Sequence, residues 1–413
     1  MIFPTGSKVT GKKQHLKFSS IGEKTMTTPT KRIAINNGGG YVPGLNTVLT
    51  GAILAANELG WEVIGIRDGF DGLLFPERYL EGGTVPLSHH LVEALSGAAS
   101  PILGIAARTD PFHVRTVNSE NQVEEVDRSN ELLETLRKDH IEGVISVVSA
   151  RNLGILWKLD RKGLKTVCVP TSVENDIAAT VLSFGFNSAL SYATETLDRA
   201  RQAAQSARKI GVVEVLGEHA GWLALQAGIA VCADAVFIPE IPYDLAKVAA
   251  NVQRKLKAAG RHSGLVVVAE GATPLAGHQA SQTQAQSPNP FRVSLCPGAM
   301  DPESSHVIER SGHVAETVAL QLQRQTGQET YPLVLGPLVK AGAPTAVDRQ
   351  LGLGYGAAAV RAIKENQTGV MVAFQPPEVK LVPLAEAINR IRTVPTDSVF
   401  LQVARSLGIA LGD

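Results

Sequence analysis

The chain has 413 residues, of which 44% are hydrophobic, and this is enough for one large α/β domain or two domains of ordinary size. Its 39 basic and 39 acidic side chains balance, which argues against nucleic-acid partners and anionic membranes, because both attract proteins with a basic excess. The cysteines are few and far apart, and no apolar run approaches the roughly 20 residues of a membrane span. We therefore expect a globular, cytoplasmic protein without a disulfide scaffold, a zinc ribbon or a membrane anchor.

Residues 1–30 are polar and mildly basic without sustained periodicity, so they are predicted to form a disordered tail. From Arg32 onward, short apolar runs alternate with helical stretches. Strands are predicted at 33–36, 62–67, 143–148, 165–169, 210–215, 233–238 and 264–269, and helices at 46–59, 151–161, 187–204, 245–258 and near 307–324. This alternation is typical of parallel sheets with helices on both faces, in which ligands bind at loops that follow the strands.

One segment interrupts the alternation. Residues 273–304 are rich in glutamine, serine, proline and glycine, so they are predicted to form a mobile insertion. A disordered insertion and a lid over a site both fit this composition.

A glycine-rich turn follows the first predicted strand. In Gly38–Gly40, the missing side chains let backbone N–H groups approach a phosphate at the start of a helix. Leu45 and Asn46 replace the Lys and Ser/Thr of a Walker A motif, and Pro43 replaces the third glycine of a dinucleotide fingerprint. Phosphate binding and a tight turn with Asn46 as helix cap both remain open.

Polar residues also follow later strands. Glu174 and Asp176 lie two residues apart beside hydroxyl side chains, and could position a nucleophile and a divalent metal or form a polar turn. The other strand-end segments are 213–221 with His219, Pro239-Glu240, and 335–344 followed by Asp348-Arg349. Each of these could equally be a solvated turn or a helix start.

In their order and spacing, these segments resemble the phosphofructokinase family from about Arg32 to near the C-terminus. The blocks that carry the resemblance are PGLNTVLTGAI, EVIGIRDGFDGL, PTSVENDI, FGFNSALSYATETLDRARQ, KIGVVEVLG, ADAVFIPE and LGPLVKAGAPTAVDR. The block VVVAEGA and the chain length look closer to the long, pyrophosphate-dependent branch. The resemblance implies an α/β fold of two doubly wound, Rossmann-like subdomains with the site in the cleft between them.

The resemblance also implies a division of the chain and an activity. A donor-binding subdomain is expected at 31–186 plus about 346–413, and a substrate-binding subdomain at 187–345. The implied reaction transfers a phosphoryl group from ATP or pyrophosphate, with Mg²⁺, to fructose 6-phosphate or a related sugar phosphate. A homodimer or homotetramer is implied as well.

Site residues follow from the resemblance position by position, and no metal ligand is assigned. The expected catalytic residues are Glu174 and Asp176. The expected donor-binding residues are Gly38, Gly39, Gly40, Tyr41, Arg108 and Arg151. The expected substrate-binding residues are Ser172, Lys209, Glu218, Glu240 and Lys340.

The sequence departs from the family pattern in both anion-binding regions, the one for the donor phosphate and the one for the sugar phosphate. Glu174 stands where the family has its proton-accepting Asp, and the Gly-Gly-Asp-Gly block falls on Val147–Ala150, which carries no carboxylate. Glu218 reverses the charge of a substrate-binding arginine, and Lys340 replaces another arginine. Three interpretations stay open: a phosphotransferase with altered motifs, a catalytically silent regulatory or metabolite-binding homologue, and a cleft adapted to a neutral or cationic ligand.

Overall fold

The computed structural model describes residues 31–97, 101–104, 109–117, 121–275 and 312–413. The predicted tail at 1–30, most of the predicted insertion at 273–304, and Arg108 lie outside these residues.

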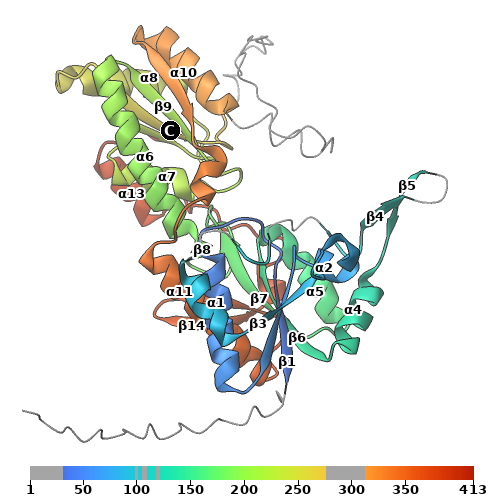
Figure 1. Cartoon of the computed structure of the whole chain (residues 1–413). Helices are drawn as coiled ribbons and strands as arrows, with labels where there is room; N and C mark the ends of the chain where they lie inside the picture. The colour runs from blue at the N-terminus through green and yellow to red at the C-terminus, as the bar shows by residue number, and fades with distance from the viewer. Residues whose placement is uncertain (1–30, 98–100, 105–108, 118–120, 276–311) are drawn as a thin grey trace, which may run out of the picture.

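The larger of two main sheets lies in the lower body of Figure 1 and has the strand order β14-β13-β7-β6-β1-β2-β3, with short β8 paired to β7. The strands from β13 to β2 run parallel, and the edge strands β14 and β3 run antiparallel to their neighbours. The bounds are β1 (Arg32–Asn37), β2 (Glu62–Ile66), β3 (Thr84–Leu87), β6 (Ile141–Val148), β7 (Thr166–Ser172), β8 (Phe184–Gly185), β13 (Val370–Gln375) and β14 (Glu378–Pro383).

The smaller sheet lies in the upper body and is parallel throughout, with the order β10-β11-β9-β12. Its strands are β9 (Ile210–Val215), β10 (Ala235–Phe237), β11 (Gly264–Ala269) and β12 (Thr330–Val334). A separate antiparallel hairpin, β4 (Val114–Val117) with β5 (Val123–Val126), projects from the larger body (Figure 1).

Helices cover both faces of each sheet. The α-helices are α1 (Leu45–Glu58), α2 (Asp71–Leu74), α3 (Val92–Gly97), α4 (Ser129–Lys138), α5 (Leu153–Arg161), α6 (Phe186–Ala207), α7 (Trp222–Ala230), α8 (Leu245–Ala258), α10 (His313–Thr326), α11 (Ala346–Lys364), α12 (Leu384–Ala387) and α13 (Val399–Ser406). Short 3₁₀ turns are η1 (Pro76–Arg78), η2 (His89–Leu91), η3 (Ala150–Asn152) and η4 (Gly336–Lys340). None of the helices in the described part of the chain is both long and apolar enough to span a membrane.

The alternation of side chains along the strands explains the two layers of helices. In β1, Ile33 and Ile35 belong to the core that includes α1 and α11, whereas Ala34 belongs to the core that includes α4 and α5. In β9, Val213 packs in the same core as α6 and α7, and Val212 packs with α8 and α10. Strands that are buried on both faces need nearly continuous apolar sequence, and this is the pattern from which they are predicted.

The last residues of the chain return to the smaller sheet, unlike the predicted division that places 346–413 with the larger one. Ala410 forms a parallel bridge with Ala235, and its carbonyl accepts a hydrogen bond from Val236 N–H at 2.9 Å. Figure 1 shows α13 in the upper body, beside α6 and α7. The physical reason is that β10 is an edge strand, and the returning segment pairs with its free backbone groups.

Helices α1 and α11 approach each other closely at glycines, which gives a stability prediction. A Cβ atom at Gly356 would lie 2.2 Å from the carbonyl oxygen of Val48, whereas a Cβ atom at Gly354, in the same helix, would meet nothing within 4 Å. We expect Gly356→Ala to lower the free energy of unfolding by about 1–3 kcal/mol or more, because the helices must move apart. Gly354→Ala should be neutral or stabilise by up to about 1 kcal/mol. Urea denaturation of both variants checks this, and equal effects would contradict the close approach.

Candidate active site in the cleft between the two sheets

A tight polar loop follows the carboxyl end of β7 and carries both predicted catalytic carboxylates. The Ser172 hydroxyl accepts a hydrogen bond from Glu174 N–H at 3.0 Å and donates one to Asp176 Oδ1 at 2.6 Å. Asn175 has a φ of 55° and is buried, and its amide accepts from Ser183 N–H at 2.9 Å and donates to the carbonyl of Val181. The loop is therefore held from both sides, which fixes the positions of the two acids.

The Glu174 side chain points to the facing subdomain. Its Oε2 accepts a long hydrogen bond, 3.4 Å, from the backbone N–H of Glu218. The pKa of Glu174 is raised to about 7, mainly by burial and then by the nearby charges of Asp176 and Glu270. The Lys340 ammonium and the backbone N–H of Glu218 lower it by less. A carboxyl group with this pKa can both release and accept a proton near neutral pH.

The raised pKa of Glu174 predicts a pH-dependent cost to folding. Because its pKa rises from 4.5 in the unfolded chain to about 7 in the fold, the stability that it contributes is present below pH 4.5 and is lost as pH rises through about 7. We expect Glu174→Gln to remove this loss, so that the variant gains about 3 kcal/mol relative to the natural chain between about pH 4.5 and pH 8. Urea denaturation across this pH range checks it, and parallel stability curves for the two proteins would contradict it.

The turn between β9 and α7 forms the opposite wall. Gly217, with a φ of 146°, donates its N–H to Glu270 Oε1 at 3.3 Å, and burial raises the pKa of the Glu270 carboxyl. Glu240 accepts from Gly221 N–H at 3.0 Å and from Val394 N–H at 2.7 Å. The Glu240 carboxylate thus ties the turn to the C-terminal segment, in addition to any role toward substrate.

A C-terminal segment that the sequence did not single out joins both walls. Arg392 N–H donates to the carbonyl of Asp176 at 2.7 Å, and Arg392 Nη1 donates to the carbonyl of Asn175 at 3.2 Å. The guanidinium lies 4.0 Å from the ring centroid of Trp222, the first residue of α7, whose indole N–H donates to the Arg392 carbonyl at 2.8 Å. Arg392 lies outside the quoted blocks, and Glu270 lies in the block VVVAEGA without being singled out, because only the fold brings these distant segments together.

The glycine turn packs tightly on the donor side. A Cβ atom at Gly39 would lie 2.6 Å from Thr171 Cγ2 and 2.9 Å from the backbone nitrogen of Ser149. The Asn37 amide donates to the carbonyls of Gly40 and Gly104, at 3.2 and 3.0 Å. These contacts explain why glycine is needed and preorganise the turn. Helix α1 begins at Leu45 after Gly44, so the prediction of Asn46 as helix cap is wrong. The side-chain oxygen Oδ1 of Asn46 instead accepts a hydrogen bond from Ile102 N–H at 3.3 Å.

A pocket of about 250 Å³ opens beside this turn, and Gly38, Phe70, Val148 and Arg151 line it. Val148, at a position where the family has glycine, would touch a Cβ atom at Gly38 at 3.1 Å, so its side chain occupies space next to the turn. Asp110 also lines the pocket.

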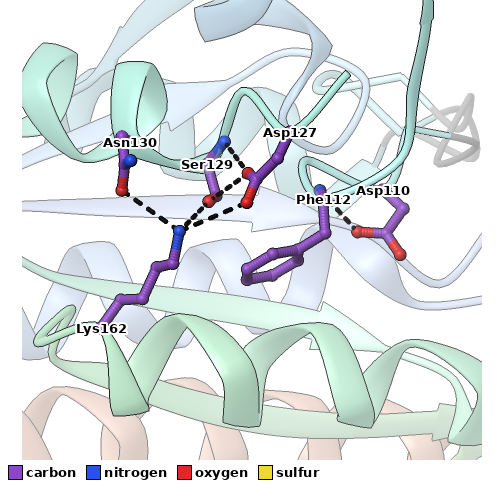
Figure 2. Close-up of polar contacts among 6 residues, drawn as sticks. All are labelled: Asp110, Phe112, Asp127, Ser129, Asn130 and Lys162. Atoms are coloured by element: carbon purple, nitrogen blue, oxygen red, sulfur yellow. Dashed lines mark hydrogen bonds and ion pairs between the residues drawn. The ribbon is translucent and has the colours of Figure 1, made fainter. Parts of the chain in front are cut away.

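A polar cluster holds the Asp110 segment in place, as Figure 2 shows. Asp110 accepts from Phe112 N–H at 2.9 Å, and Phe112 lies under the ammonium of Lys162, 5.3 Å from its ring centroid. Lys162 Nζ also donates to Ser129 Oγ at 2.6 Å, and Ser129 holds the pKa of Asp127 below its usual range by hydrogen bonding. The cluster fastens the segment that precedes the β4–β5 hairpin to the end of α5.

An ion pair crosses the cleft. Arg151 Nη2, from the turn after β6, lies 3.1 Å from Glu218 Oε2, from the turn after β9. The Arg151 side chain is 76% exposed and that of Glu218 is 30% exposed, so the pair contributes at most about 1 kcal/mol. A predicted donor-binding residue and a predicted substrate-binding residue therefore meet each other.

The magnesium site that the resemblance implies would need carboxylate ligands on the donor side of the cleft. Val147–Ala150 supply no carboxylate, and the Asp176 carboxylate accepts from Ser172. Across the described ranges, no group of three or more His, Cys, Asp or Glu side chains is arranged to hold a metal ion. The residues that the structure describes do not fit a magnesium site of their own, so we assign no metal ligand.

The predicted site residues gather only in part. The cleft brings together Ser172, Glu174, Asp176, Glu218 and Lys340, with Arg151 and the Gly38–Tyr41 turn on the donor side. Lys209 lies elsewhere: it precedes β9, at the end of the strand opposite to the Gly217 turn, and pairs with Glu329 at 2.9 Å.

Comparisons with known proteins show which family the chain resembles. The family described as "Phosphofructokinase" matches residues 32–363. The ATP-dependent 6-phosphofructokinase of Chloroflexus aggregans is 34% identical over 388 residues, covering 94% of this chain and 99% of that protein. The pyrophosphate–fructose 6-phosphate 1-phosphotransferase of Amycolatopsis methanolica is 34% identical over 367 residues, covering 89% of this chain and 97% of that protein.

Solved structures support the fold prediction. The pyrophosphate-dependent phosphofructokinase from Marinobacter aquaeolei superposes with a TM-score of 0.69 at 20% identity, covering 93% of this chain and 92% of that chain. The corresponding enzyme from Nitrosospira multiformis gives a TM-score of 0.69 at 21% identity, covering 93% of each chain. The predicted fold class is confirmed. With the family match across most of its length and relatives above 30% identity, this chain belongs to the phosphofructokinase family.

Proposed function

We propose that the protein transfers a phosphoryl group from ATP or pyrophosphate to fructose 6-phosphate or a related sugar phosphate, with Glu174 as the proton acceptor. The observation that carries the proposal is the Glu174 carboxyl, which stands in the cleft on a fixed loop with a pKa of about 7. A general base works best when its pKa lies near the working pH.

In the proposed step, the acceptor hydroxyl oxygen attacks the transferred phosphorus. Its proton passes to the Glu174 carboxylate while the bond from phosphorus to the donor oxygen breaks, and ADP or phosphate leaves with that electron pair. Lys340 and Arg151 are the nearby cations available to balance charge, since phosphoryl transfer depends mainly on positioning and electrostatic stabilisation. Arg151 Nη2 pairs with Glu218 Oε2, so a phosphate would compete with that carboxylate or share the guanidinium with it.

A direct assay tests this proposal. The purified chain is incubated with fructose 6-phosphate and the magnesium complex of either ATP or pyrophosphate, and fructose 1,6-bisphosphate is followed by ³¹P NMR. We expect product with at least one donor. Donor hydrolysis without sugar bisphosphate, or no reaction with a panel of sugar phosphates, would contradict the proposal.

A second candidate function is a catalytically silent, metabolite-binding homologue. It is favoured by the Arg151–Glu218 pair across the cleft and by the absence of a carboxylate at Val147–Ala150. This candidate predicts no turnover, together with a higher melting temperature when a sugar phosphate or nucleotide binds the folded state. A cleft adapted to a cationic ligand has less support, because Glu218 pairs with Arg151 and Glu240 binds backbone N–H groups.

The proposal includes a homodimer or homotetramer in the cytoplasm, as family membership implies. Light scattering after size-exclusion chromatography measures the oligomeric state, and a monomer at assay concentration would contradict that part.

A further inference from the structure

A second pocket lies in the smaller subdomain, and its lining shares no residue with the cleft. It has a volume of about 300 Å³ and opens between α8 and residues 405–413 at the end of the chain. Buried apolar side chains of Val248, Ile409 and Leu411 form part of its lining. This volume is at the lower end of the range for small-molecule sites.

The lining is strongly basic in a chain that carries no net charge overall. Four basic side chains line the pocket, namely Lys247, Arg254, Lys255 and Arg405. The lining contains one acidic residue, Asp413, and its carboxylate forms an ion pair with Arg405. A local excess of positive charge at a concave surface attracts and concentrates small anions.

Three of these cations have no carboxylate within ion-pair distance in the part of the chain that the structure describes. Arg254 donates to Asn251 Oδ1 at 2.6 Å, and neither the Lys247 nor the Lys255 ammonium makes a hydrogen bond there. Lys255 is half-buried against the turn at Gly408, where a Cβ atom would lie 3.7 Å from Nζ.

The surroundings of Lys255 show that its charge is only partly balanced. Burial lowers the pKa of Lys255. The charge of Asp234 opposes this effect, whereas the cations of Arg261 and Arg254 add to it. Asp234 itself is already paired with Arg261 at 2.6 Å. An anion in the pocket would supply the missing counter-charge.

We propose that this pocket binds a small phosphate-bearing molecule through Lys247, Arg254 and Lys255. Lysine ammonium groups meet phosphate as point charges, and the arginine fork can bind two phosphate oxygens at once. The apolar lining gives an organic ester additional surface to contact. This site is separate from the proposed phosphoryl transfer and does not depend on it.

Lysine labelling tests the proposal at single residues. The full chain is treated with an amine-reactive ester, and the labelling of each lysine is measured by peptide mass spectrometry with and without inorganic phosphate or pyrophosphate. We expect saturating anion to slow labelling of Lys255 and Lys247 by about tenfold, because only the unoccupied fraction reacts. Lys257, on the same helix but outside the lining, is the internal control.

Variants and salt controls decide the outcome. Arg254→Gln is expected to raise the phosphate concentration that half-protects Lys255 by about tenfold, whereas Lys257→Met should leave it unchanged. Sodium chloride at matched ionic strength should not protect. Equal protection by chloride, equal protection of Lys257, or protection of Lys255 that is unchanged in Arg254→Gln would overturn the proposal. None of these readouts requires turnover, so failure here and failure of the proposed phosphoryl transfer are distinguishable.

Discussion

Glu174→Gln is expected to lower kcat for phosphoryl transfer by about 10³-fold while the protein stays folded, because the amide cannot accept the proton of the acceptor hydroxyl. The loop should keep its shape, since its hydrogen bonds use the Glu174 backbone N–H and the side chains of Ser172 and Asn175. KM should change little. Steady-state kinetics with the donor found to be active measures both constants.

The pH dependence of kcat/KM is a second test of the role of Glu174. Because the base must be ionised, kcat/KM is expected to fall as pH drops below the Glu174 pKa of about 7. Glu174→Asp is the matched variant: it keeps a carboxylate but shortens the side chain, so about 10²-fold loss with a retained acidic limb is expected. If folded Glu174→Gln keeps full activity, Glu174 is not the general base.

Arg392→Met is expected to lower kcat by about 10²-fold with a smaller change in KM. Arg392 touches no reacting atom in the proposed mechanism, and its side chain acts through the carbonyl of Asn175 and the ring of Trp222. The substitution removes these two contacts and leaves the backbone bond to Asp176, so the catalytic loop is held less firmly, and a displacement of about 1 Å at the base can cost this much rate. Kinetics and thermal unfolding are measured on the same samples.

Two further variants separate positioning from simple destabilisation. Arg392→Lys keeps the charge but not the planar stacking, so partial recovery of kcat is expected. Arg390→Met removes an exposed cation two residues away and should leave kcat unchanged. If Arg392→Met lowers the melting temperature but leaves kcat and its pH profile intact at a temperature where the variant is folded, Arg392 is a structural residue only.

Much of the fold could be predicted because each element carries its own local pattern. The bounds of β9, β11 and α8 coincide with their predicted ranges, since buried strands and an amphipathic helix leave a direct signature in the sequence. Glu174 and Asp176 could be singled out because they follow a strand in a family block. Neither their shared contact with Ser172 nor the pKa of Glu174 could be predicted, because both depend on the facing subdomain.

Other features depended on long-range contacts that no local pattern records. Arg392 lies 217 positions from Asn175 along the chain. Ala410 pairs with Ala235 at the edge of the smaller sheet, although the predicted division placed residues 346–413 with the larger subdomain. The predicted substrate-binding role of Glu240 stays a prediction, while its bonds to Gly221 and Val394 show a further use of the same carboxylate.

The Arg151–Glu218 pair links the two subdomains through exposed side chains, so we expect the strength of this link to depend on ionic strength. At a physiological Debye length of about 8 Å, added salt weakens an exposed contact of this kind. We expect the subdomains to separate more often as salt rises, and a phosphorylated ligand to do the same by competing with Glu218 for the guanidinium. Opening of the cleft would then be coupled to arrival of its anionic ligand.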